Sequence, residues 1–79
     1  MKEKTNYNEY RGMNFQDWCA LDEDDTRELK IKLYDSKEDK VKFFSSEQLI
    51  TPNEMFILQE SIIQDILLID NHWRIKLVY

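Results

Sequence analysis

The sequence predicts a small α+β protein with a three-stranded, mainly antiparallel sheet in ββαβ order, one long helix packed on one face of the sheet, and an N-terminal extension. Three segments, residues 27–34, 40–44 and 72–79, alternate apolar and polar side chains with the two-residue period of half-buried strands. A helix-capping motif stands between the second and the third segment. The chain has 79 residues, which is enough for a single modest core. We therefore expect one domain over residues 13–79, preceded by an arm over residues 1–12.

The arm is expected to be mobile. Residues 1–12 are polar or charged apart from Tyr7 and Tyr10, and they end at the only glycine of the chain, Gly12. A terminal segment with so little apolar surface is seldom held against a core.

Residues 14–21 fit two kinds of secondary structure. Phe15 and Trp18 lie about one helical turn apart, and Asn14 suits the N-cap position with Asp17 at the third helical position. The alternation that begins in the same region suits a strand instead. We favour a short helix within the N-terminal extension.

Residues 27–34 and 40–44 form a predicted hairpin, because the five residues between them have the length of a hairpin loop. We expect the first of these strands in the middle of the sheet, antiparallel to both neighbours, and residues 72–79 parallel to the second strand. In the register that we expect, Lys32 lies opposite Lys42.

The long helix has a defined start. Thr51 suits the N-cap, Pro52 the first helical position and Glu54 the third, which together make a capping box. The apolar residues that follow fill about half of the helix circumference, so the helix is expected to continue to about Ile69, with Asn71 in its C-terminal turn.

The predicted core combines one phase of each strand with the apolar face of the helix. Its members are Leu29, Ile31, Leu33, Val41, Phe43, Leu58, Ile62, Ile66, Trp73, Ile75 and Leu77.

The other phase of the strands predicts a basic outer face on the sheet. The residues assigned to this face are Lys30, Lys32, Tyr34, Lys40, Lys42, Phe44, Arg74 and Lys76. Such a face could bind an acidic protein or a phosphate backbone, with Tyr34 and Phe44 available for stacking. The alternative is that these lysines are ordinary solvated residues that keep sheet edges apart.

Two apolar residues, Ile57 and Leu68, break the expected amphipathic pattern because they fall on the polar side of the predicted helix. Ile57, Ser61, Gln64 and Leu68 form one stripe on the polar side of the predicted helix. We interpret the stripe as a surface for a partner or for homodimer formation, or as a site covered by the N-terminal arm. Scattered exposed apolar residues are the alternative interpretation.

An acidic run, Asp22, Glu23, Asp24 and Asp25, precedes the first predicted strand. Its spaced negative charges could mimic DNA, in the manner of small inhibitors of phage or mobile-element type. This is an analogy of size and charge alone, and a solvated loop is the alternative.

Several classes of function are disfavoured. The one histidine, the one cysteine and the one glycine supply neither a metal site, a catalytic triad nor a phosphate-cradling loop, so we expect no enzyme, no cofactor and no bound metal. We also expect no membrane span and a cytoplasmic location. A net charge of −5 weighs against a general nucleic-acid binder. The sequence therefore favours a non-enzymatic interaction protein with a protein partner, an inhibitor or regulator; the alternative is a nucleic-acid-binding domain that uses the basic sheet face.

Overall fold

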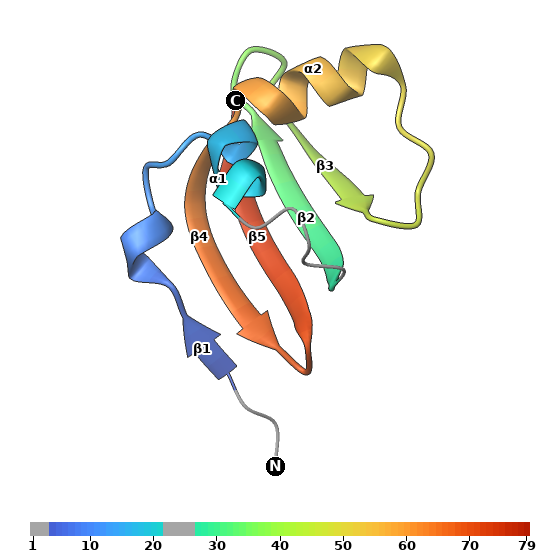
Figure 1. Ribbon diagram of the computed structural model, residues 1–79. Helices are drawn as coiled ribbons and strands as arrows, with labels where there is room; N and C mark the ends of the chain where they lie inside the picture. The colour runs from blue at the N-terminus through green and yellow to red at the C-terminus, as the bar shows by residue number, and fades with distance from the viewer. Residues whose placement is uncertain (1–3, 22–26) are drawn as a thin grey trace.

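The structure is a computed structural model that describes residues 4–21 and 27–79. The elements follow one another as β1 (Lys4–Asn6), the 3-10 helix η1 (Asn8–Tyr10), α1 (Phe15–Leu21), β2 (Glu28–Asp35), β3 (Lys40–Ser45), α2 (Pro52–Glu60), β4 (Ile62–Ile69) and β5 (His72–Val78). Among the described residues, the strands form one mixed sheet in the order β1-β4-β5-β2-β3 (Figure 1). Four strands are long and β1 adds three residues at one edge; β2 and β5 run parallel, and the other neighbours run antiparallel.

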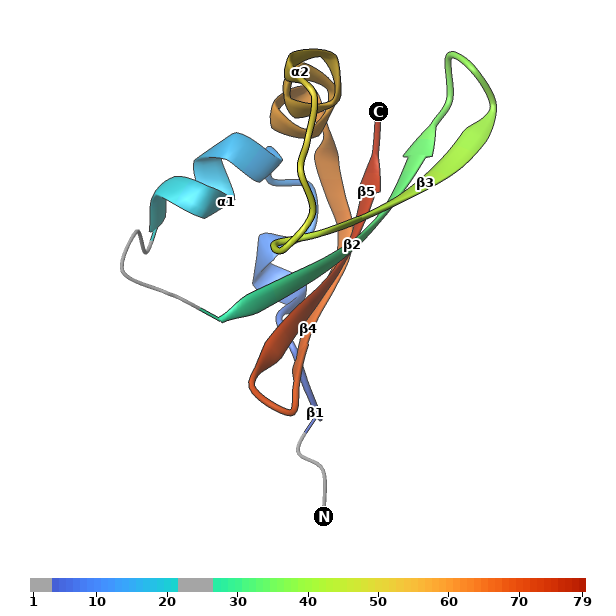
Figure 2. The same cartoon turned by 90° about the vertical axis from the view of Figure 1, so that its right-hand side faces the viewer.

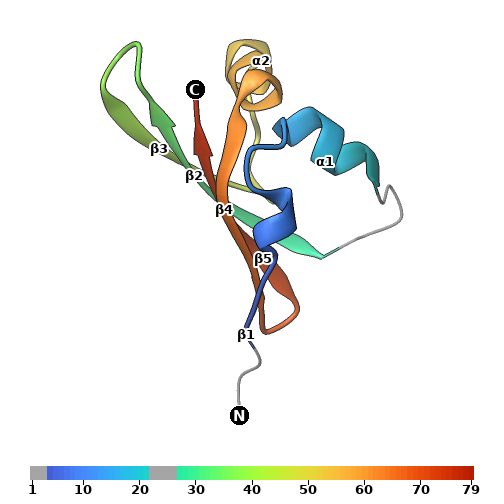
Figure 3. The ribbon, with the colours of Figure 1, turned by 90° about the vertical axis from the view of Figure 1, so that its left-hand side faces the viewer.

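The two faces of the sheet have different surroundings. Helices α1 and α2 lie on the same face, here named the covered face, while no helix among the described residues lies on the opposite, open face (Figures 2 and 3). Between the sheet and the helices lies the core, made of Phe15, Ile31, Leu33, Phe44, Leu58, Ile63, Ile66, Trp73, Ile75 and Leu77.

The prediction of a three-stranded sheet with one long helix is wrong. Helix α2 ends at Glu60, Ser61 takes the extended conformation, and residues 62–69 form β4. Asp70 and Asn71 then have positive φ angles of 51° and 63° and join β4 to β5 in a two-residue hairpin turn. Two consecutive left-handed residues are the signature of the type I′ turn, which asparagine and aspartate tolerate. Asn71 therefore closes a hairpin and does not end a helix.

The pattern of residues 62–69 fits both kinds of structure. Isoleucines at positions 62, 63, 66 and 69 recur at spacings that a helix face would also show. Their β-branched side chains restrict χ1 and favour a pleated strand. Pairing with β5 on one side and with β1 on the other satisfies the backbone of this segment in the extended state.

The extra strand also corrects the direction of β5. Its predicted range, residues 72–79, and its place beside the first strand of the hairpin are confirmed. However, β5 runs parallel to β2, with partners from Glu28 and His72 to Tyr34 and Val78, whereas we predicted an antiparallel pair. The reason is that β4 reverses the chain once more between α2 and β5.

The predicted phase of β3 is wrong. The hairpin of β2 and β3 is confirmed, but Leu33 lies opposite Lys42, one residue from the expected register. As a result Phe44 is buried in the core, while Val41 and Phe43 lie on the open face and are 48% and 68% exposed. The sequence allows both phases because two phenylalanines are adjacent, and the pairing with β2 selects one.

Ile62 is a further incorrect core assignment. It lies opposite Val78 at the start of β4 and is 43% exposed. The helical phase would have placed it with Leu58, but the change to a strand after Ser61 turns its side chain to the open face.

The short helix within the N-terminal extension is confirmed as α1. Asn14 Oδ1 accepts hydrogen bonds from the backbone N–H groups of Gln16 and Asp17, at 3.0 and 3.3 Å, as an N-cap does. The Asn14 amide in turn donates to the carbonyl of Gln59, 2.9 Å away. One residue therefore starts α1 and fastens it to the end of α2.

The capping box of α2 is also confirmed. Thr51 Oγ1 accepts from the Glu54 backbone N–H, and Glu54 Oε1 accepts from the Thr51 backbone N–H, at 3.2 and 3.1 Å. The hydrogen bonds that the Glu54 carboxylate accepts from the backbone and hydroxyl of Thr51 lower the pKa of Glu54. These contacts fix the start of the helix and favour the ionised form of the Glu54 carboxylate.

The N-terminal segment lies along β4. The β1 strand pairs with β4, the Tyr7 N–H donates to the Ile66 carbonyl at 3.1 Å, and the Gly12 N–H donates to the Ile63 carbonyl at 2.8 Å. Gly12 has a φ of 86°, which glycine adopts without the strain of a Cβ atom. The described part of the arm is therefore hydrogen-bonded to the sheet edge, and its mobility stays a prediction.

Candidate functional site

Four cationic side chains lie together on the open face. Lys30 and Lys32 of β2 are paired with Arg74 and Lys76 of β5, one pair beside the other, and all four are exposed. Neighbouring strands lie about 4.8 Å apart, so the four positions form a compact square. We name these residues the basic quartet. These four residues lie on one face opposite the helices, as predicted, but Lys42, which was assigned to the same face, does not.

The quartet has little neutralisation from nearby acids. Among the described residues, no carboxylate lies within salt-bridge distance of Lys30, Lys32 or Lys76. Asp65 lies opposite Lys76 on β4, but its carboxylate is in a salt bridge of 3.2 Å with Arg11. Like charges side by side on paired strands repel each other, so an anion bound here would relieve that repulsion.

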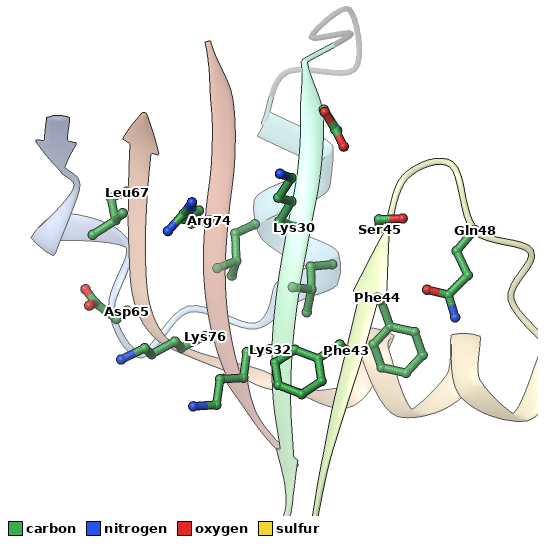
Figure 4. Close-up of a pocket in the computed structure, with 13 residues that line it drawn as sticks. Lys30, Lys32, Phe43, Phe44, Ser45, Gln48, Asp65, Leu67, Arg74 and Lys76 are labelled. Carbon is green, nitrogen blue, oxygen red and sulfur yellow. The ribbon is translucent and has the colours of Figure 1, made fainter. Parts of the chain in front are cut away.

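The quartet lines a hollow in the open face. The hollow has a volume of about 820 Å³ and extends across four strands, from Asp65 and Leu67 on β4 to Phe43 on β3. Figure 4 shows the cationic side chains between these two borders, with the helices behind the sheet. Glu28 and Asp65 are its acidic lining residues.

An aromatic ring borders the quartet. Phe43 lies opposite Lys32 and is 68% exposed, which is unusual for so large an apolar side chain. Tyr34 is next along the same face and is 39% exposed; its hydroxyl donates to Asp39 Oδ1 at 2.6 Å, and this bond raises the pKa of Tyr34. The bond holds the phenol while leaving the ring accessible. The neighbouring row of side chains, Ile62, Val78, Tyr34 and Val41, is mainly apolar.

Three residues assigned to the basic face lie elsewhere. Lys40 lies opposite Asp35, on the phase of β3 that faces the helices. Lys42 shares that phase, and its ammonium lies 3.9 Å from Asp35 and 3.7 Å from Glu38. Phe44 is in the core. The ring that lies beside the quartet is Phe43, which the sequence-based assignment missed because Phe43 and Phe44 are equally apolar.

The predicted stripe is not formed. Ile57 packs against the core from α2, and Ser61 is buried, with its hydroxyl donating to the Ile57 carbonyl at 2.6 Å. Gln64 is exposed at a register shift in β4, and Leu68 packs against the core from the covered side of β4. The change from helix to strand separates these four residues, so they do not share one surface.

The acidic run, Asp22, Glu23, Asp24 and Asp25, lies outside the described residues. Within residues 4–21 and 27–79, no cluster of three histidine, cysteine, aspartate or glutamate side chains is arranged to hold a metal ion. None of the helices in this part of the chain is long and apolar enough to cross a membrane.

Comparison with protein-family models, with curated protein sequences and with solved structures finds no match to this chain. The assignment of function therefore depends on the chemistry of the open face.

Proposed function

We propose that this protein is a non-enzymatic binding module that receives single-stranded nucleic acid on the open face of its sheet. The observation that carries the proposal is the basic quartet: Lys30, Lys32, Arg74 and Lys76 are adjacent and exposed, and none of the four forms a salt bridge with another described residue. Phosphates would lie against these cations and displace counterions.

The exposed ring beside the quartet supports a nucleic acid in preference to an acidic protein. Modules for single strands combine a cationic groove with aromatic rings on which bases stack. Phe43 supplies such a ring directly opposite Lys32. A duplex is a poorer fit, because its major groove admits a helix or a two-stranded ribbon, and both helices lie on the covered face.

The net charge of −5 does not exclude this function. At physiological ionic strength the Debye length is about 8 Å, so acids farther from the quartet are largely screened. Within the lining of the hollow, four cations face two acids, Glu28 and Asp65, and the second is already paired with Arg11. The local field is therefore positive although the whole chain is acidic.

The first test is the salt dependence of binding to a short fluorescein-labelled oligothymidine, measured by anisotropy. Four phosphate contacts predict a log–log slope of about −2.8 for a single strand, which is an affinity loss of about 50-fold between roughly 50 and 200 mM salt. The double variant Lys30→Gln, Lys76→Gln should halve the slope. Lys40→Gln, on the other phase of β3, is the matched control and should keep the parent slope.

Phe43→Ala separates stacking from charge. It should weaken binding by about tenfold, since a stacked base contributes about 1–3 kcal/mol, and leave the salt slope unchanged. Two results would overturn the proposal: no binding at low salt, or equal binding of polyglutamate with the same dependence on the quartet. The second result would favour an acidic protein segment as the partner.

A further inference from the structure

Within residues 4–21 and 27–79, the β3 strand has an unpaired edge. It is the last strand in the sheet order, and β2 is its neighbour on one side only. The Ser46 N–H donates to the Leu29 carbonyl at 3.1 Å. Because bonded pairs alternate along an antiparallel ladder, the backbone groups of Val41, Phe43 and Ser45 point away from β2.

A second contact supports this assignment. The Tyr79 N–H donates to the Tyr34 carbonyl at 2.9 Å, so the even-numbered residues of β2 point to β5 and the odd-numbered ones point to β3. The Ser45 carbonyl accepts from the Gln48 N–H at 3.1 Å, which marks the end of the free edge. The free backbone groups with which an extended chain can pair therefore run from Val41 to the Ser45 N–H.

Two of the side chains on the open face of this edge, Val41 and Phe43, are large and apolar. Val41 and Phe43 are 48% and 68% exposed, and their backbone groups point away from β2. Natural sheets commonly blunt an edge with proline, a bulge or a charge directed at the incoming strand. Residues 41–45 contain no proline, and β2 and β3 pair without a register shift. The one charged residue of this segment, Lys42, has its ammonium 3.9 Å from Asp35 and 3.7 Å from Glu38, within this chain.

We infer that β3 pairs antiparallel with β3 of a second copy of this chain, in a register centred on Phe43. Val41 then lies opposite Ser45 of the second copy, and Phe43 lies opposite its own equivalent on the open face. Lys42 lies opposite Phe44 of the second copy, so that no lysines oppose one another. A register centred one residue earlier would place Lys42 against Lys42, and this repulsion selects the Phe43-centred register.

If the open face binds nucleic acid as proposed, pairing through β3 joins the binding faces of two copies, and this step rests on the proposed function. Antiparallel pairing of two identical strands relates the two copies by a two-fold axis. This axis is perpendicular to the shared sheet, so both open faces lie on the same side. The two β2 strands are three strand spacings apart, roughly 14 Å. Two basic quartets then flank a central pair of phenylalanine rings on one continuous face, and the second copy contributes half of the site.

Cysteine cross-linking tests the register. In a Cys19→Ser background, Phe43→Cys should form an intermolecular disulfide, because residues directly opposite in a bonded pair have Cα atoms about 5.5 Å apart. Val41→Cys is the matched control. It lies on the same edge, but its equivalent in the second copy is four residues along the strand, about 13 Å away, which is too far for a disulfide.

The oligomeric state provides an independent readout. Sedimentation equilibrium of the Cys19→Ser protein should show a species of twice the 9.7 kDa protomer mass that dissociates on dilution. Val41→Pro should abolish this species while keeping the circular dichroism spectrum, because the Val41 N–H is not needed for pairing with β2. Phe56→Lys, at an exposed aromatic residue of α2, should leave the dimer intact.

A monomer at every concentration, or cross-linking of Val41→Cys as fast as that of Phe43→Cys, would overturn the inference. A dimer that cross-links through Phe43→Cys but does not bind the oligothymidine would support the pairing and refute the proposed function. The two proposals therefore fail in different measurements.

Discussion

The covered and open faces of the sheet are formed by alternate side chains of the same strands, and they differ in burial and charge. On β2, Ile31 and Leu33 face the helices and are almost fully buried, while Lys30 and Lys32 face outward and are exposed. The covered face gains stability by removing apolar area from water. The open face keeps like charges adjacent, at some cost in stability, and leaves Phe43 exposed. The comparison indicates that the covered face holds the fold together, whereas the charges and the exposed ring of the open face are not explained by burial.

The largest expected effect separates the two faces by burial. Leu33→Ala, at a residue with no exposed surface, should lower the free energy of unfolding by about 2–5 kcal/mol. Ile62→Ala, at an exposed residue of the open face, should change it by about 0.5 kcal/mol or less. Urea denaturation followed by tryptophan fluorescence measures both. Equal losses for the two variants would contradict the assignment of Ile62 to the open face.

A smaller effect on stability is expected at the turn that fixes the register between β4 and β5. Asn71 has a left-handed φ of 63°, so Asn71→Ala should cost about 1 kcal/mol of unfolding free energy. Asn71→Gly removes the Cβ atom and should be close to neutral, although it loses the bond from Arg27 Nε to Asn71 Oδ1. Thermal unfolding of the two variants tests whether Asn71→Gly is the more stable one. If alanine and glycine were equally well tolerated, the left-handed conformation would not be a constraint.

The change in the free energy of unfolding on relief of charge repulsion at the open face should be smaller still. Lys32→Gln removes one member of the quartet, opposite Lys76, and should raise the free energy of unfolding by about 0.2–0.5 kcal/mol at low salt. The gain should disappear at high salt, where the parent charges are screened. Lys40→Gln, opposite the carboxylate residue Asp35, is the control and should show no gain. Destabilisation by Lys32→Gln at low salt would show that the quartet is not under repulsion.

The smallest expected effect is a pH dependence at the start of α2. Hydrogen bonds from Thr51 lower the pKa of Glu54 in the folded state, so this carboxylate stabilises the fold above its ordinary pKa of 4.5. The contribution is lost as the pH falls below that value through the lowered folded pKa. Melting temperatures across this range should fall less steeply for Glu54→Ala than for the parent. Glu60→Ala, at the other end of the helix, should follow the parent curve.

The sequence by itself determined the local features. The start of α2 follows from hydrogen bonds between residues three positions apart, and the N-cap of α1 follows from the same kind of contact at Asn14. The ranges of β2, β3 and β5 and the alternation that places the quartet on one face were also readable, because each depends on a period within one short segment. These features require no knowledge of what lies beside them.

Only the tertiary structure decided between patterns that are locally equivalent. Residues 62–69 suit a helix or a strand, and the hairpin turn at Asp70 and Asn71, with β1 and β5 on either side, selected the strand. The adjacent rings of Phe43 and Phe44 suit either phase, and the pairing of Leu33 with Lys42 selected which ring is buried. A shift of one residue in register exchanges the two faces of a strand at no local cost. The exposed ring at the border of the candidate site is therefore a property of strand pairing, which no pattern within β3 contains.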